Sequence, residues 1–339
     1  MNMQLKIGEF PRIAFVMGDP AGISAEIAAK LLADRTIHEK ASLLVIGDRR
    51  TLAEGEQIAG VETNIKVVTE PRAAKSGEPL FYDLKNCDPK SVPLGRATQA
   101  GGTGVIANFR TGLELARDGF ADAVFFTPFN KQALRLAGNP YLDEIHFAAD
   151  VLGYTGPCSE FNILGKIWNA RVTSHIPFKD VVKFITVDSV LNALALTDKT
   201  MRLAGFKNPR IALAALNPHA GDGGTFGTEE IDILEPALAR AKLQGIAAQG
   251  PFPADTVFLR ARAGQFDAVQ TLFHDQGQIA IKALGFDQGV TVLGGMPVPV
   301  CTPAHGTAYD IAGKGIASIE AAKRAFAIAC SMGSGRMLV

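Results

Sequence analysis

Residues 266–282 read Phe-Asp-Ala-Val-Gln-Thr-Leu-Phe-His-Asp-Gln-Gly-Gln-Ile-Ala-Ile-Lys. The apolar part, 266–273, predicts a mostly buried strand, and His274 and Asp275 follow it directly. Because ligands of open α/β sheets bind at the carboxyl ends of strands, the stretch predicts a functional site at a strand end, with His274 as its first candidate. A histidine that only caps a turn would give the same local pattern.

The length and charge of the chain limit what it can be. Its 339 residues predict two domains, and 47% of them are hydrophobic, which is ample for buried cores. The 34 Lys and Arg residues are matched by 34 Asp and Glu residues. Since this balance attracts no polyanion, neither nucleic acid nor an anionic membrane is expected as a partner.

The cysteines and the apolar runs predict the compartment. The four cysteines are far apart and show no CxxC spacing, so neither a disulfide framework nor a thiolate zinc site is indicated. The chain starts without a basic and then apolar leader, and no apolar run approaches about 18 residues. A reduced, cytoplasmic setting is therefore expected.

Strand-like and helix-like patterns alternate along the chain. Residues 11–17 predict a strand, followed by a glycine-containing turn at 18–23 and a helical pattern through Leu32. Positions 106, 109, 113 and 116 have helical spacing. Further strand-like runs lie at 41–48, 121–128, 170–175, 210–217 and 289–293. This alternation predicts the α/β class with a largely parallel sheet, while 54–92 supports no functional interpretation.

Three histidines stand at or just beyond the ends of predicted strands: His175, His219 and His274. If those strands share one sheet, the three imidazoles converge on one crevice. Neutral imidazoles with open positions suit a divalent metal such as zinc, cobalt or manganese. Three unrelated turn histidines would show the same spacing, so the sequence leaves both interpretations open.

A second candidate segment begins at His305. Gly306 and Thr307 could offer backbone and hydroxyl donors to a cofactor, while Asp310 could accept a hydrogen bond from a ribose hydroxyl or an adenine amine. An ordinary loop before a helix is the alternative.

Several motifs in order give the chain a family resemblance. It resembles, over most of its length, the 4-hydroxythreonine-4-phosphate dehydrogenase family of pyridoxal phosphate biosynthesis. The matching pieces are Gly18-Asp19-Pro20-Ala21-Gly22-Ile23 with Glu26, Thr127-Pro128 with Asn130-Lys131, Thr173-Ser174-His175-Ile176-Pro177, Asn217-Pro218-His219-Ala220-Gly221, Gly227-Thr228-Glu229-Glu230, Pro253-Ala254-Asp255-Thr256, His274-Asp275-Gln276-Gly277 with Lys282, and His305-Gly306-Thr307-Ala308.

The resemblance implies an isocitrate/isopropylmalate-dehydrogenase-like fold of two α/β/α domains with an active-site cleft between them. Residues 1–129 and 300–339 would form the first domain. Residues 130–299 would form the second, with most metal and substrate residues and the interface of a homodimer.

The resemblance also implies roles for individual residues. A divalent metal (Zn, Co, Mn or Mg) would be held by His175, His219 and His274, with ligands drawn from both subunits. NAD or NADP would bind near His305, Gly306, Thr307 and Asp310. Lys282 would reach the substrate, and Asp255 and Asp275 are candidates for orienting ligands or substrate.

The chain departs from the family at substrate positions. Glu144 and Ile145 stand within the segment where the family has Gly-His-Thr-Glu, Thr291 replaces an asparagine, and Val300 replaces a phosphate-facing arginine. The loss of an arginine removes a bidentate phosphate clamp, and Glu144 adds negative charge. A phosphate in the family's pose would therefore be poorly matched.

The reaction implied is oxidation of a secondary hydroxyl of a hydroxy acid with NAD(P), followed by decarboxylation of the β-keto acid. The substrate would be 4-hydroxythreonine-4-phosphate or a different hydroxy acid. Alternatives are a phosphorylated four-carbon sugar acid and a carboxylated cis-dihydrodiol of aromatic catabolism. Rivals of another class are an acyl or phosphoryl transferase and a non-catalytic binding protein on the same fold.

Overall fold

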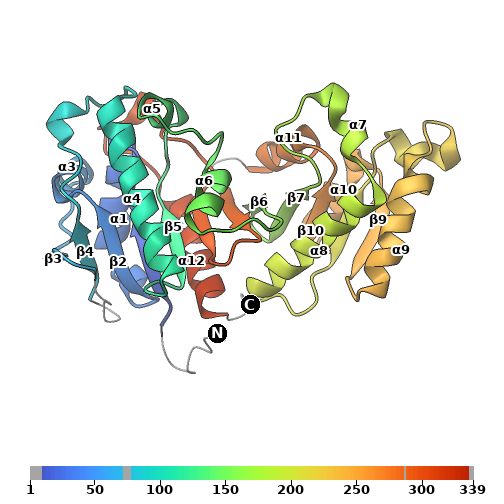
Figure 1. Cartoon of the computed structure of the whole chain (residues 1–339), viewed down its shortest axis with the longest axis horizontal. Helices are drawn as coiled ribbons and strands as arrows, with labels where there is room; N and C mark the ends of the chain where they lie inside the picture. Colours follow the sequence, from blue (N-terminus) through green and yellow to red (C-terminus); the bar gives the residue numbers. More distant parts are fainter. Residues whose placement is uncertain (1–9, 72–77, 286–287, 336–339) are drawn as a thin grey trace. The chain divides into compact units, whose positions relative to one another are not determined.

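The computed structural model describes residues 10–71, 78–285 and 288–335. They form two compact units (Figure 1). Unit 1 runs to Gly156 and regains the chain at Val290–Val292 and from Met296. Unit 2 comprises Pro157–Gly289 and Leu293–Gly295.

The strands of unit 1 pair in the order β3-β4-β2-β1-β5-β12, and the pairings described between them are parallel. Their bounds are β1 Arg12–Val16, β2 Ser42–Gly47, β3 Lys66–Val68, β4 Leu80–Asp83, β5 Ala123–Phe126 and β12 Val300–Pro303. Strand β11 (Val290–Gly294) is divided between the two units.

Helices cover both faces of this sheet. Successive residues of a strand point to opposite faces, and successive residues of β1 and β5 are buried, so both faces need a covering layer. Phe15 of β1 stacks edge-on against Phe125, which meets Phe326 of α12. Val16 faces Gly112 of α4, where a Cβ would lie 2.5 Å from its side chain. The helices of unit 1 are α1 Ser24–Ala33, α2 Arg35–His38, α3 Arg49–Ala59, α4 Gln99–Arg117, α5 Lys131–Leu136, α6 Glu144–Val151 and α12 Glu320–Ser334.

The strands of unit 2 pair in the order β6-β7-β10-β8-β9. Only the hairpin of β6 with β7 is antiparallel among the pairings described in this unit. The bounds are β6 Ser159–Leu164, β7 Ile167–Arg171, β8 Ile211–Ala214, β9 Ala248–Phe252 and β10 Ala268–Thr271.

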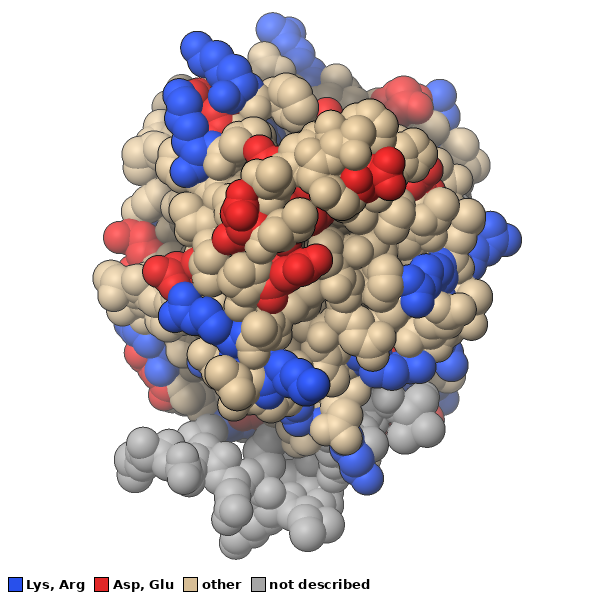
Figure 2. Space-filling view, turned by 90° about the vertical axis from the view of Figure 1, so that its right-hand side faces the viewer, with Lys and Arg blue, Asp and Glu red and all other residues tan. Residues whose placement is uncertain are grey.

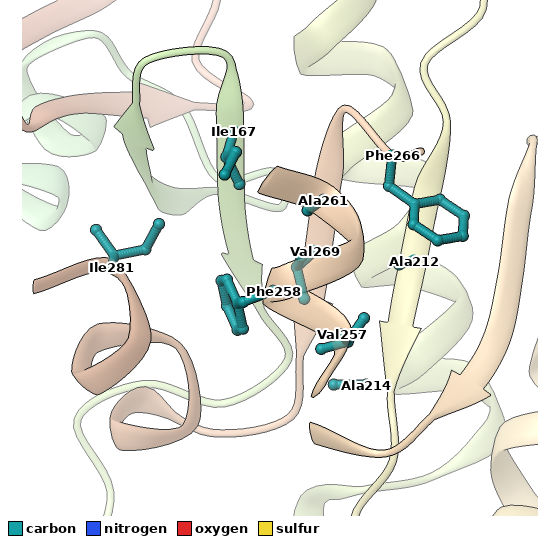
Figure 3. Close-up of a cluster of buried hydrophobic side chains, with 9 residues drawn as sticks. All are labelled: Ile167, Ala212, Ala214, Val257, Phe258, Ala261, Phe266, Val269 and Ile281. Carbon is teal, nitrogen blue, oxygen red and sulfur yellow. The ribbon is translucent and has the colours of Figure 1, made fainter. Parts of the chain in front are cut away.

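The core of unit 2 lies between its sheet and helices α10 and α11 (Figure 3). Phe258 and Val257 of α10 and Ile281 of α11 pack with Val269 of β10 and Ala212 of β8. On the opposite face, Thr197 of α8 donates a hydrogen bond to Gln270 of β10. The helices are α7 Val181–Phe184, α8 Val187–Leu203, α9 Glu235–Leu243, α10 Ala254–Arg262 and α11 His274–Gly285.

The predicted α/β class and largely parallel sheets are confirmed. Each predicted strand overlaps one observed strand, although the run 170–175 shares only its first two residues with β7. The unassigned stretch 54–92 contains most of α3 together with β3 and β4. Unit 1 extends to Gly156, past the expected boundary at residue 129, because α5 and α6 pack against α4.

The surface carries both signs of charge. Figure 2 shows Lys and Arg interspersed with Asp and Glu on one face, amid uncharged surface. Within the described residues, none of the helices is both long and apolar enough to cross a membrane.

Candidate active site

Two of the three predicted histidines lie side by side at the sheet edge of unit 2. β7 and β10 are parallel neighbours with Arg171 opposite Thr271, and the Thr173 amide continues the pairing by donating to the Leu272 carbonyl. His175 and His274 therefore leave adjacent strands at the same edge, and their ring centroids are 5.6 Å apart. Both rings are accessible.

The third histidine, His219, occupies an unusual turn after β8, Pro218–Gly224. His219, Ala220 and Asp222 all have positive φ, a conformation that is strained for residues with a Cβ and that surrounding contacts must hold. The His219 ring lies beside Phe226. Across the described part of the chain, no group of three His, Cys, Asp or Glu side chains is arranged to hold a metal ion.

Glu230 anchors the start of the His219 turn. Its Oε1 accepts hydrogen bonds from the Leu216 and Asn217 amides, and its Oε2 accepts one from Asn217 Nδ2. Burial acts to raise the pKa of this carboxyl, but the donors at Asn217 and Leu216 outweigh burial and lower it. An ionised Glu230 thus holds the turn, a role that the Gly227–Glu230 motif did not reveal.

The carboxylates and the lysine predicted for this site are exposed. Asp275 Oδ1 lies 2.7 Å from His274 Nδ1, which orients that imidazole. Lys282 follows two turns later on α11, and Asp255 stands in the first turn of α10. Asp275 therefore has a partner within the predicted site, whereas the roles of Asp255 and Lys282 stay predictions.

The predicted cofactor segment packs on the glycine-containing turn of unit 1. The Ile23 amide donates to the Thr307 carbonyl, and a Cβ on Gly22 would lie 2.5 Å from that oxygen. The Tyr309 hydroxyl donates to the fully buried Asp19 at 2.5 Å. Two motifs far apart in the sequence thus form one surface, on which His305, Gly306 and Asp310 remain accessible.

The residues predicted to bind substrate differ in how accessible they are. Glu144, which opens α6 after its cap Asp143, lines a cavity of about 130 Å³ in unit 1. Thr291 is half-buried in β11. Ile145 is buried and Val300 is fully buried in β12, so the structure gives no support to a substrate contact by these two.

The cavity has aromatic walls and a charged lining. Phe109, Phe129, Tyr141 and Phe147 contribute rings to it. Lys131, Arg135 and Glu144 contribute charges. Lys131 belongs to one of the family motifs quoted above, whereas Arg135 belongs to none of them. Their positions one helical turn apart on α5 were the signal that could have found the pair.

Comparison with known proteins gives the family. The model for "Pyridoxal phosphate biosynthetic protein PdxA" matches residues 39–329. A protein of Rhizobium meliloti (strain 1021), named "Putative 4-hydroxythreonine-4-phosphate dehydrogenase 2", is 56% identical over 95% of this chain and 93% of its own length. A "Putative D-threonate 4-phosphate dehydrogenase" of Symbiobacterium thermophilum is 36% identical over 94% and 95%, respectively.

Solved structures agree with the fold. The 4-hydroxythreonine-4-phosphate dehydrogenase of Klebsiella pneumoniae superposes with a TM-score of 0.81 at 31% identity, covering 96% of this chain and 98% of that one. A terephthalate 1,2-cis-dihydrodiol dehydrogenase of Burkholderia xenovorans LB400 has a TM-score of 0.67 at 25% identity, covering 97% and 99%. A weaker match to a β-decarboxylating dehydrogenase confirms the predicted fold class.

The fold and site together define a two-unit α/β protein with paired histidines at the carboxyl edge of a parallel sheet. The chain belongs to the PdxA family.

Proposed function

We propose that this protein is a metal-dependent, NAD(P)-linked dehydrogenase that oxidises a secondary hydroxyl of a small hydroxy acid, with decarboxylation of the resulting β-keto acid. One observation carries the proposal: the ring centroids of His175 and His274 are 5.6 Å apart at the ends of adjacent parallel strands. Lys282 lies two turns further along the helix that begins with His274. Family membership and relatives named as dehydrogenases support it.

The imidazole nitrogens of these histidines suit a divalent metal such as zinc, cobalt or manganese. Hydrogen bonding of His274 Nδ1 to Asp275 leaves Nε2 as the free ligand atom, an arrangement common at metal sites. His175 is the second donor, and His219 of a second copy of the chain is proposed as the third, which makes the enzyme a homodimer. When bound, such a metal polarises a substrate oxygen and lowers the pKa of its hydroxyl.

The residues of the chain have separate tasks in this proposal. Asp275 orients His274, and Asp255 orients the substrate. Lys282 places a positive charge near the oxygen that becomes negative during decarboxylation, and it supplies the proton to the carbon that carbon dioxide leaves. His305, Gly306, Thr307 and Asp310 bind NAD or NADP, whose nicotinamide receives the hydride.

The substrate we propose is a phosphorylated four-carbon hydroxy acid. Relatives named for 4-hydroxythreonine-4-phosphate and for D-threonate 4-phosphate support this class. Val300 supplies no phosphate clamp, so the phosphate needs other cations. Lys131 and Arg135, on one face of α5, are the candidates.

A second candidate substrate is a carboxylated cis-dihydrodiol. The cavity of about 130 Å³ beside Glu144 favours it, since four aromatic rings line this cavity. An apolar cavity of roughly 150 Å³ accommodates benzene in another protein, so a six-membered ring is of suitable size.

The test is an absorbance assay for reduced nicotinamide with 4-hydroxythreonine-4-phosphate, D-threonate 4-phosphate and a carboxylated cis-dihydrodiol. Each substrate is assayed with NAD or NADP, with added divalent metal or with chelator, and carbon dioxide release is measured in parallel. We expect metal-dependent turnover of one phosphorylated acid. Turnover of the dihydrodiol alone would select the second candidate, and no reduced nicotinamide from any of them would refute the dehydrogenase.

A further inference from the structure

A buried arginine stands at the end of β7, four residues before His175. The Arg171 side chain is 1% exposed. Its Nη2 donates to Glu160 at 2.7 Å, its Nη1 donates to Asn162 at 2.9 Å, and its Nε donates to Ser174 at 3.0 Å. Burying a guanidinium is costly even beside a carboxylate, and apolar side chains of similar size often stabilise a fold equally well. Stability alone therefore gives no reason for an arginine here.

The hydrogen bonds of Arg171 lead to both histidines. Ser174, which receives its Nε hydrogen bond, is the neighbour of His175 in the chain. Asn162 Oδ1, which receives its Nη1 hydrogen bond, also accepts one from Gln278 Nε2 at 2.6 Å. Gln278 lies one turn after His274 on α11. A single, partly buried network thus ties the His175 segment to the helix that begins with His274.

The backbone allows this helix to sit close to β7. A Cβ on Gly277 would lie 2.3 Å from the side chain of Asn169 in β7, so only glycine permits the approach. The close contact limits where α11 can lie, and the hydrogen bonds limit how it can turn. Polar networks that are buried and well paired rigidify their surroundings in this way.

We propose that Arg171 is a positioning residue that sets the spacing of His175 and His274. This inference rests on the proposed function, in which the two imidazoles hold a divalent metal. Arg171 acts through Ser174 on the His175 side and through Asn162 and Gln278 on the His274 side.

The test compares Arg171→Met and Gln278→Leu with the wild-type protein. Cobalt affinity is measured by competition with a chromophoric chelator, and thermal unfolding is followed with chelator present. We expect Arg171→Met to lower cobalt affinity about 10- to 100-fold, the range found when outer partners of metal ligands are removed. Gln278→Leu should give a smaller loss, and Arg171→Lys should recover part of it.

Arg210→Met is the matched control. Arg210 also pairs with a carboxylate, that of Asp267, but at the opposite end of the strands from the histidines, just before β8 and β10 begin. The cobalt affinity of the Arg210→Met variant should equal that of the wild type. A purely structural role for Arg171 predicts a lower unfolding temperature with unchanged cobalt affinity in both Arg171→Met and Gln278→Leu, and that result would overturn the proposal.

A second measurement keeps the two proposals distinguishable. Histidine ring NMR signals of the metal-free protein report the local arrangement directly. If the wild type binds no cobalt, the proposed function fails. The positioning role is then decided by NMR, because the His175 and His274 signals should both move in Arg171→Met, whereas unchanged signals would refute it.

Discussion

Asp19 is a fully buried carboxyl in the turn that packs against the Thr307 segment. It accepts hydrogen bonds from the Tyr309 hydroxyl and the Ala21 amide. Burial raises the pKa of Asp19 above its ordinary value of 3.8, more than these two donors lower it. Burial likewise raises the pKa of Tyr309, and the hydrogen bond to Asp19 adds to this. Burial thus disfavours the charged form of both groups.

Asp19→Asn tests this effect through the pH dependence of stability. Because the folded pKa is raised, the folded state binds the Asp19 proton more tightly than the unfolded state does. That contribution is present below 3.8 and is lost as the pH rises through the folded pKa. The free energy of unfolding of Asp19→Asn, measured in urea, should therefore rise relative to wild type between these two values.

Asp118→Asn is the control, since Asp118 is exposed and carries no comparable burial. A difference between Asp19→Asn and wild type that stays constant over the whole pH range would show that the pKa of Asp19 is not raised.

At the scale of elements, α10 shows how one helix contributes to the core and to the surface. Phe258 is 5% exposed and belongs to the cluster that also holds Val257, Ala261 and Phe266 (Figure 3). Its neighbour Leu259 is 59% exposed. Adjacent positions on a helix differ in direction by about 100°, which separates the two side chains.

Phe258→Ala should lower the free energy of unfolding by about 3–5 kcal/mol, because it removes buried apolar surface and leaves a cavity. Leu259→Ala, the matched control, should change it by no more than about 0.5 kcal/mol. Urea unfolding followed by circular dichroism measures both. Similar losses in the two variants would contradict the assignment of this face of α10 to the core.

At the scale of the whole molecule, the segment after His175 exposes large apolar side chains. Phe178, Val182 and Phe184 are all exposed. Contiguous exposed apolar residues commonly mark a protein interface. Their position next to His175 fits the proposed homodimer, in which a second copy completes the metal site.

Val182→Glu should therefore give monomers in sedimentation velocity at concentrations where the wild type is dimeric, and it should weaken cobalt binding at the same time. Leu243→Glu, at an exposed apolar position on α9, should alter neither property. Should Val182→Glu remain dimeric with wild-type cobalt affinity, this segment would not be the interface.

Local patterns predicted much of the fold. Short, nearly continuous apolar runs placed strands such as β1, β5 and β10 correctly, because a strand that is buried on both faces is apolar along almost its whole length. They failed between residues 54 and 92, where β3 is largely exposed and β4 only partly buried, so the apolar signal is weak.

The sequence by itself determined the α/β class, the family and the histidines worth testing, since these depend on periodicity and on the order of motifs. Only the tertiary structure decided which residues meet. The register of β7 on β10 brings His175 to His274 across 98 intervening residues. Nothing local marks Arg171 or Glu230 as partners of the histidine turns. Their contacts arise from strand order and helix packing. These involve distant parts of the chain and produce no periodic pattern in the sequence.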